Sequence, residues 1–175
     1  MRIHIFIDVL FIIIFIVRFF FFFFFHHNLY GKKNNNFQMS KQKILELIIG
    51  SNNQGKLKEI KDLLPKNIKV FTPMDFNLKS PRENGKTFSQ NSIIKARHYS
   101  KKTGKICLSD DSGLEIDILK KAPGIHSARW GGKEKNFNLG IKKVYNKLDK
   151  VDKAWRNKKI KARFVCAITI YWAKQ

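Results

Sequence analysis

Two adjacent carboxylates, Asp110 and Asp111, are followed by Ser112 and Gly113 and stand at the end of the apolar run Ile106–Leu108, after Ser109. Successive side chains of a strand point to opposite faces. One carboxylate can therefore face a cleft while its neighbour braces the turn or reaches a metal through water. Mg²⁺ takes oxygen ligands and needs few from the protein when phosphates supply the rest. The pattern predicts a divalent-cation site at a strand end, with a polar Asx turn between two strands as the alternative.

A second element suited to phosphate lies upstream. The apolar, β-branched run Ile44–Ile49 predicts a buried strand, and the small polar loop Gly50–Lys56 follows it. A helical pattern comes next, so the loop directs backbone N–H groups and a positive helix end towards an anion. Lys56 adds a mobile cationic donor. The spacing is not that of a Walker loop, and for the segment alone we favour a simple helix cap.

The elements that position these residues alternate along the chain. The patterns predict strands at 44–49, 68–72, 106–109, 114–118 and 162–172, and helices at 54–64, 87–102 and 136–149. Strands that alternate with helices are typical of an α/β domain. Thr87 and Gln90 predict a capping box at the start of the second helix, with Phe88, Ile94 and Tyr99 as its core contacts.

Four segments together resemble one family. They are SNNQGK (Ser51–Lys56), ENGKTFSQNSIIKAR (Glu83–Arg97), SDDSGLEID (Ser109–Asp117) and APGIHSARW (Ala122–Trp130), in this order. The chain resembles the inosine triphosphate pyrophosphatase family from about residue 43 to residue 172. The resemblance implies an elongated mixed sheet flanked by helices, two lobes with a central nucleotide cleft, and a homodimer. It also implies Mg²⁺-dependent hydrolysis of ITP, dITP or XTP to the monophosphate and pyrophosphate.

The resemblance also implies roles for individual residues. Asp111 matches the metal-binding carboxylate that is also the proton acceptor, with Asp110 beside it as a further metal ligand. Glu83 is our choice for the other acidic ligand, although some relatives carry that acid one position earlier, where this chain has Arg82. The expected substrate contacts are Ser51, Asn52, Asn53, Gln54, Gly55, Lys56, Lys95, Ser112 and Arg129.

These roles agree with the chemistry of the reaction. Hydrolysis between the α and β phosphates concentrates negative charge on the leaving pyrophosphate, which a metal and lysines such as Lys56 and Lys95 would stabilise. A carboxylate beside the metal can orient or deprotonate the attacking water. For Lys95 the alternative is an ordinary solvated helix lysine. The single histidines His98 and His126 have no partner at ligand spacing, which favours structural or surface roles.

The first 38 residues differ in kind from residues 39–175. Residues 3–25 are almost entirely Ile, Val, Leu and Phe, and 31–38 form a polar, low-complexity linker. The apolar stretch is long enough for a membrane anchor. We favour a start of translation at Met39, because an upstream stretch of A/T-rich DNA read in frame would produce such Phe and Ile runs. The anchor is the alternative.

The other end of the chain carries the strong β pattern Ala162–Trp172 three residues before the last one. The resemblance places this strand well before the end of the family's domain and assigns base recognition to later segments not found here. We therefore expect a C-terminally incomplete domain, an unpaired strand edge and weak activity with poor base discrimination. A truncated, inactive or membrane-tethered fragment that binds anions without turnover is the competing interpretation.

Composition limits the remaining possibilities. The formal net charge of +22, from 35 Lys+Arg against 13 Asp+Glu, usually suggests nucleic acid or an anionic membrane. The lysines are scattered, however, and lack the aromatic interleaving of a nucleic-acid module, so we expect no specific nucleic acid. Cys107 and Cys166 both fall in predicted strands, which indicates small core residues rather than a disulfide and suits a reducing cytoplasm.

Overall fold

The computed structural model describes residues 45–134 and 136–173. The two interpretations of residues 1–38, a leader upstream of Met39 and a membrane anchor, lie outside the described residues. Within the described ranges, no helix combines the length and the apolar character that a membrane crossing needs.

The described elements follow the predicted order closely. The strands are β1 (Leu45–Ile49), β2 (Ile68–Phe71), β3 (Ile106–Ile116) and β4 (Ala162–Tyr171). The α-helices are α2 (Gln54–Leu63), α3 (Phe88–Thr103), α4 (Ser127–Trp130) and α5 (Phe137–Val151). Short 3₁₀ turns are η1 (Pro73–Phe76), η2 (Asp117–Leu119), η3 (Gly124–His126) and η4 (Trp155–Asn157).

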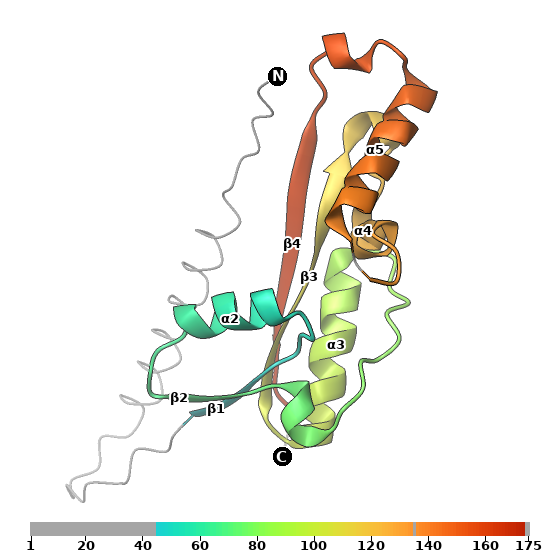
Figure 1. Ribbon diagram of the computed structural model, residues 1–175. Helices are drawn as coiled ribbons and strands as arrows, with labels where there is room; N and C mark the ends of the chain where they lie inside the picture. The colour runs from blue at the N-terminus through green and yellow to red at the C-terminus, as the bar shows by residue number, and fades with distance from the viewer. Residues whose placement is uncertain (1–44, 135, 174–175) are drawn as a thin grey trace, which may run out of the picture.

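The strands form one mixed sheet in the order β2-β1-β3-β4. Strand β1 is parallel to both β2 and β3, while β4 runs antiparallel to β3. Figure 1 shows β3 and β4 as a long ribbon, with β1, β2 and α2 at one end and α4 and α5 at the other. The predicted α/β class with an elongated mixed sheet flanked by helices is confirmed.

Helices α2 and α3 cover opposite faces of the sheet (Figure 1). Apolar residues of α2 pack with alternate residues of β1 and β3, forming one buried cluster of Leu47, Ile49, Leu57, Ile60, Leu64, Ile68 and Leu108. The other face packs on α3 through the cluster of Ile48, Ala96, Tyr99 and Cys107. Burial of this apolar surface from both sides drives the packing of the sheet, and it fixes which β3 side chains meet which helix.

A third cluster lies at the far end of the ribbon. Leu148 of α5 is buried there with Ile116, Leu119 and Trp155, and the Trp155 ring stacks on Tyr145 at 5.5 Å between centroids. This end of the molecule therefore has a small core of its own.

The segment around the paired aspartates differs from our prediction. We expected two strands, 106–109 and 114–118, joined by a turn at Asp110–Gly113, but β3 is continuous from Ile106 to Ile116. Each residue of the presumed turn pairs with β4, for example Asp110 with Ile168 and Ser112 with Cys166. Long antiparallel pairing and charged partners from two helices outweigh the local turn preference of Asp, Ser and Gly.

One smaller prediction is confirmed and another needs correction. We expected an unpaired edge at Ala162–Trp172, and β4 is the last strand of the sheet: one edge pairs with β3 along its whole length, and the other has no strand partner among the described residues. The capping box of α3 forms only in part. Thr87 accepts a hydrogen bond from the Gln90 N–H, as predicted, but the Gln90 side chain accepts from the Lys86 N–H rather than from the Thr87 N–H.

Candidate active site

The site lies where β1 ends beside β3. The parallel pairing of these strands stops at Ile49 and Leu108, so on this edge the next residues of β3 lie beside the loop after β1, while their other edge pairs with β4. The connections from β1 and β2 run through α2 and α3 on opposite faces of the sheet, which makes this a topological switch point. In open α/β sheets, ligands bind at such points, outside the carboxyl ends of the strands.

The two adjacent aspartates point to opposite faces at this position. Asp110 meets Lys56 of α2, and Asp111 meets Lys95 and Asn91 of α3. Both carboxylates belong to residues that are at most 9% exposed. Strand alternation therefore divides the expected site into two charged clusters, one on each side of a single edge of β3.

The α2-side cluster centres on Lys56. Its ammonium Nζ lies 2.5 Å from Asp110 Oδ2 and donates to Ser112 Oγ at 2.6 Å, and Ser112 Oγ also donates to Asp110 Oδ2 at 3.3 Å. The Lys56 side chain remains 34% exposed. Asp110 therefore holds the lysine at the strand edge while about a third of the lysine side chain stays exposed.

Side-chain hydrogen bonds hold the loop before α2 in place. Asn53 is the N-cap of α2 and accepts from the Lys56 N–H, while Ser51 Oγ accepts from the Asn53 N–H. Asn52 Nδ2 donates to Ser80 Oγ at 2.7 Å, and Gln54 and Gly55 are exposed in the first turn. The segment is thus a helix cap, and it also directs the positive end of α2 and the Lys56 side chain towards β3.

The α3-side cluster joins Lys95 to two carboxylates. Lys95 Nζ lies 3.4 Å from Glu83 Oε1 and 3.5 Å from Asp111 Oδ1, and its side chain is only 14% exposed. Arg129 of α4 donates to the Glu83 carbonyl oxygen at 3.4 Å, so the expected contact residue Arg129 lies against the segment that carries Glu83. Lys95 is not a solvated helix lysine, which was the alternative.

The fit of a metal to these residues follows from the same geometry. Glu83 and Asp111 both direct carboxylate oxygens at one cation, the Lys95 ammonium, so they already converge on a single positive charge. Two carboxylates suit Mg²⁺ when phosphates and water supply its other ligands. The expected set of three carboxylates does not form: Asp110 lies on the opposite face, and the described residues hold no group of three potential metal ligands.

The two cysteines near the site have thiols that stay protonated at neutral pH. Cys166 lies opposite Ser112 on β4, and burial, followed by the charge of Asp110, raises the pKa of its thiol to about 11. Burial raises the pKa of the Cys107 thiol to about 12. Both cysteines are free, as predicted, and neither thiol ionises near neutral pH.

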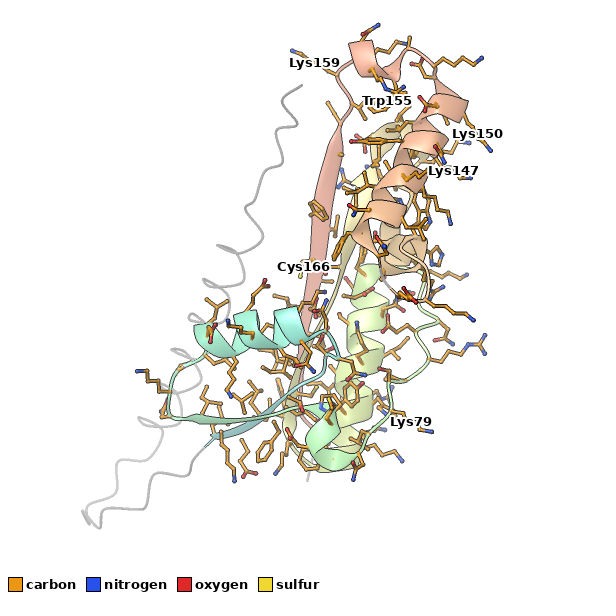
Figure 2. The ribbon with its side chains drawn as sticks, viewed as in Figure 1. Lys79, Lys147, Lys150, Trp155, Lys159 and Cys166 are labelled. Atoms are coloured by element: carbon orange, nitrogen blue, oxygen red, sulfur yellow. The ribbon has the colours of Figure 1, made fainter. Side chains whose placement is uncertain are left out.

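Much of the positive charge lies away from the site. Figure 2 labels Lys147 and Lys150 on α5 and Lys159 before β4, at the far end of the ribbon, whereas Cys166 marks β4 near the level of α2. These distal lysines point outwards, whereas Lys56 and Lys95 pair with the β3 aspartates at the switch point.

One residue of the site was missed by sequence reasoning. Asn91 is 1% exposed and donates from Nδ2 to Asp111 Oδ2 at 3.2 Å. The sequence could have pointed to Asn91, because this residue falls on the same face of the helix as Phe88, Lys95 and Tyr99. A buried amide on such a face must find hydrogen-bond partners.

The fold and site define an α/β domain with a charged, phosphate-compatible edge at the switch point of a mixed sheet. Residues 47–175 match the Ham1 family model. The chain is 42% identical over 127 residues to a dITP/XTP pyrophosphatase of Zymomonas mobilis, covering 72% of this chain and 59% of that protein. A dITP/XTP pyrophosphatase of Bacillus licheniformis is also 42% identical, with 71% and 63% covered.

Solved structures agree. A HAM1 protein from Coxiella burnetii superposes with a TM-score of 0.64 at 40% identity, covering 72% of this chain and 62% of that one. The Ham1 protein of Staphylococcus aureus gives 0.62 at 35% identity, with 73% and 64% covered. This chain belongs to the Ham1 family, which confirms the resemblance. It spans about three fifths of the length of the curated relatives it matches.

Proposed function

We propose that this chain hydrolyses the bond between the α and β phosphates of non-standard purine nucleoside triphosphates, namely dITP, XTP and ITP, and releases the monophosphate and pyrophosphate. The observation that carries the proposal is the pair of lysine–carboxylate clusters on either side of one β3 edge. The matched dITP/XTP pyrophosphatases support the choice of substrate.

A triphosphate that approaches this edge from the end of β1 would meet both clusters. Lys56 and the Ser51–Gly55 loop would hold phosphate oxygens from the α2 side. Lys95 would contact them from the α3 side and would exchange its carboxylate partners for phosphate. Both ammonium groups already lie beside the β3 edge before the ligand arrives, so they would need little movement to stabilise charge on the leaving pyrophosphate.

Glu83 and Asp111 are the residues that would hold Mg²⁺. When bound, the ion would neutralise phosphate charge and acidify a coordinated water. Asp111 is our candidate proton acceptor, because its carboxylate is fixed by Asn91 and Lys95 and a carboxylate in this position can orient an attacking water. Ser112 and Arg129 would contribute substrate contacts. In place of metal binding, we assign Asp110 to the placement of Lys56.

The proposal also covers the cellular location and the oligomeric state of the enzyme. We infer a cytoplasmic homodimer, as the family resemblance implies, with no specific nucleic-acid partner. Light scattering coupled to size-exclusion chromatography tests the dimer, because a single species at the mass of one chain would contradict it. Recovery of the tagged full chain in washed membranes would contradict the cytoplasmic assignment and favour an anchor.

The test of the function is a substrate panel. Pyrophosphate release is measured from ITP, dITP, XTP, ATP and GTP with Mg²⁺, for this chain and for a chimera that carries the remaining portion of the Zymomonas mobilis relative. We expect the chimera to prefer ITP and XTP strongly over ATP and GTP. Equal rates on all five nucleotides by the chimera would contradict the proposed substrate class.

A further inference from the structure

We infer that Asn91 is a positioning residue that fixes Glu83 relative to Asp111 and so sets the affinity of the α3-side cluster for a divalent cation. The inference rests on the proposed function, because it takes these two carboxylates as the metal ligands. In this inference Asn91 acts through Glu83 and Asp111 and is not itself a ligand of the metal.

The Asn91 side chain bridges two segments that are distant in the chain. Its Oδ1 accepts a hydrogen bond from the Gly85 N–H at 2.8 Å, and its Nδ2 donates to Asp111 Oδ2 at 3.2 Å. A carboxamide has an acceptor at one end and a donor at the other, which aspartate and leucine of similar size do not. Asn91 therefore links the backbone beside Glu83 to the strand that carries Asp111.

This link matters because the backbone is held firmly at Asp111 and less firmly at Glu83. Asp111 lies in the middle of β3, where backbone pairing fixes it. Glu83 belongs to the irregular segment between η1 and α3, and such segments are held by few contacts. The Gly85 N–H, two residues from Glu83, is tied to a buried side chain of a rigid helix. Partners that orient metal ligands in this way contribute to metal affinity without touching the ion.

Gly85 provides independent evidence that this contact is close. A Cβ at Gly85 would lie 2.6 Å from Asn91 Oδ1 and 2.7 Å from Gln90 Cβ. Any side chain at this position would push the segment away from the first turn of α3. The glycine therefore lets the backbone approach the helix closely enough for the Asn91 hydrogen bond to form.

The experiment measures Mn²⁺ binding to the full 175-residue chain by electron paramagnetic resonance. Asn91→Ala should raise the Mn²⁺ dissociation constant about 10-fold to 100-fold, and Gly85→Ala should raise it in the same direction while keeping every side chain of the site. Ser92→Ala is the matched control. Ser92 is equally buried on α3 but contacts Thr169 of β4, so its loss should lower the melting temperature and leave Mn²⁺ binding unchanged.

Each outcome is decisive. Wild-type Mn²⁺ affinity in both Asn91→Ala and Gly85→Ala would overturn the positioning role while leaving the metal assignment intact. An equal loss of affinity in Ser92→Ala would show a general effect of destabilisation and overturn it too. Absence of Mn²⁺ binding by the wild-type chain would overturn both the metal assignment and this inference. If Asn91→Ala does not fold, the Gly85→Ala chain, checked by circular dichroism, decides.

Discussion

Replacing Lys56 with methionine tests the α2-side cluster in two separate ways. The substitution keeps most of the apolar stem and removes the charge that neutralises Asp110, whose side chain is 8% exposed. Breaking a fully buried ion pair costs about 3–5 kcal/mol. Because the Lys56 side chain is 34% exposed, water can replace part of the interaction, and we expect a loss of about 2 kcal/mol in the free energy of unfolding. For a chain of this size, that lowers the melting temperature by roughly 4–8 °C.

The double variant Lys56→Met/Asp110→Asn separates stability from function. Asparagine keeps the shape of Asp110 without a buried charge, so the double variant should recover at least about 1 kcal/mol relative to the single variant. Phosphate binding should not recover, because the ammonium is still missing. We expect the dissociation constant for ITP in EDTA, measured by calorimetry, to rise about 30-fold in both variants, which corresponds to about 2 kcal/mol.

Two results would refute this reasoning. If Lys56→Met melts at the wild-type temperature, Asp110 does not depend on the lysine for its charge balance. If the double variant binds ITP as tightly as the wild-type chain, Lys56 is a structural partner of Asp110 rather than a phosphate ligand.

The remaining predictions concern neighbouring positions. Asp111→Asn should abolish most Mg²⁺-dependent turnover with the circular dichroism spectrum unchanged, and chelation by EDTA should mimic it; full activity of either sample would contradict the metal role. Gly113→Ala should lower the free energy of unfolding by about 1–3 kcal/mol in urea titration, because its Cβ would overlap the Gly124 carbonyl oxygen. Because burial raises the pKa values of Cys107 and Cys166 to about 12 and about 11, native thiols should alkylate far more slowly at pH 8 than in urea, and equal rates would contradict this.

The element order was predictable from sequence because its determinants are local. Apolar β-branched runs mark β1, β2 and β4, and a Ser/Thr/Asn residue precedes each long helix as its N-cap: Asn53, Thr87 and Asn136. Among the predicted elements, the segment that forms β3 was misassigned. Its polar centre, Ser109–Gly113, resembles a turn when only neighbours in the sequence are considered, and only the pairing with β4 and the lysines of α2 and α3 make it a strand.

The candidate site residues came from the resemblance, but their spatial grouping did not follow from it. Strand alternation implies that Asp110 and Asp111 face opposite ways, yet which helix covers each face depends on the crossover connections. Asp110 was therefore grouped with the metal ligands, whereas it pairs with Lys56. Asn91 was overlooked because its partners, the Gly85 N–H and Asp111, lie 6 and 20 residues away and meet it only through the packing of α3 on β3.

The most direct test of the proposed reaction identifies its products. The full chain is incubated with ITP and Mg²⁺, and the products are separated by anion-exchange chromatography. Cleavage between the α and β phosphates predicts inosine monophosphate and pyrophosphate in equal amounts, with their formation abolished in the Asp111→Asn variant. Inosine diphosphate with orthophosphate, or equal product formation by the Asp111→Asn variant, would contradict the account.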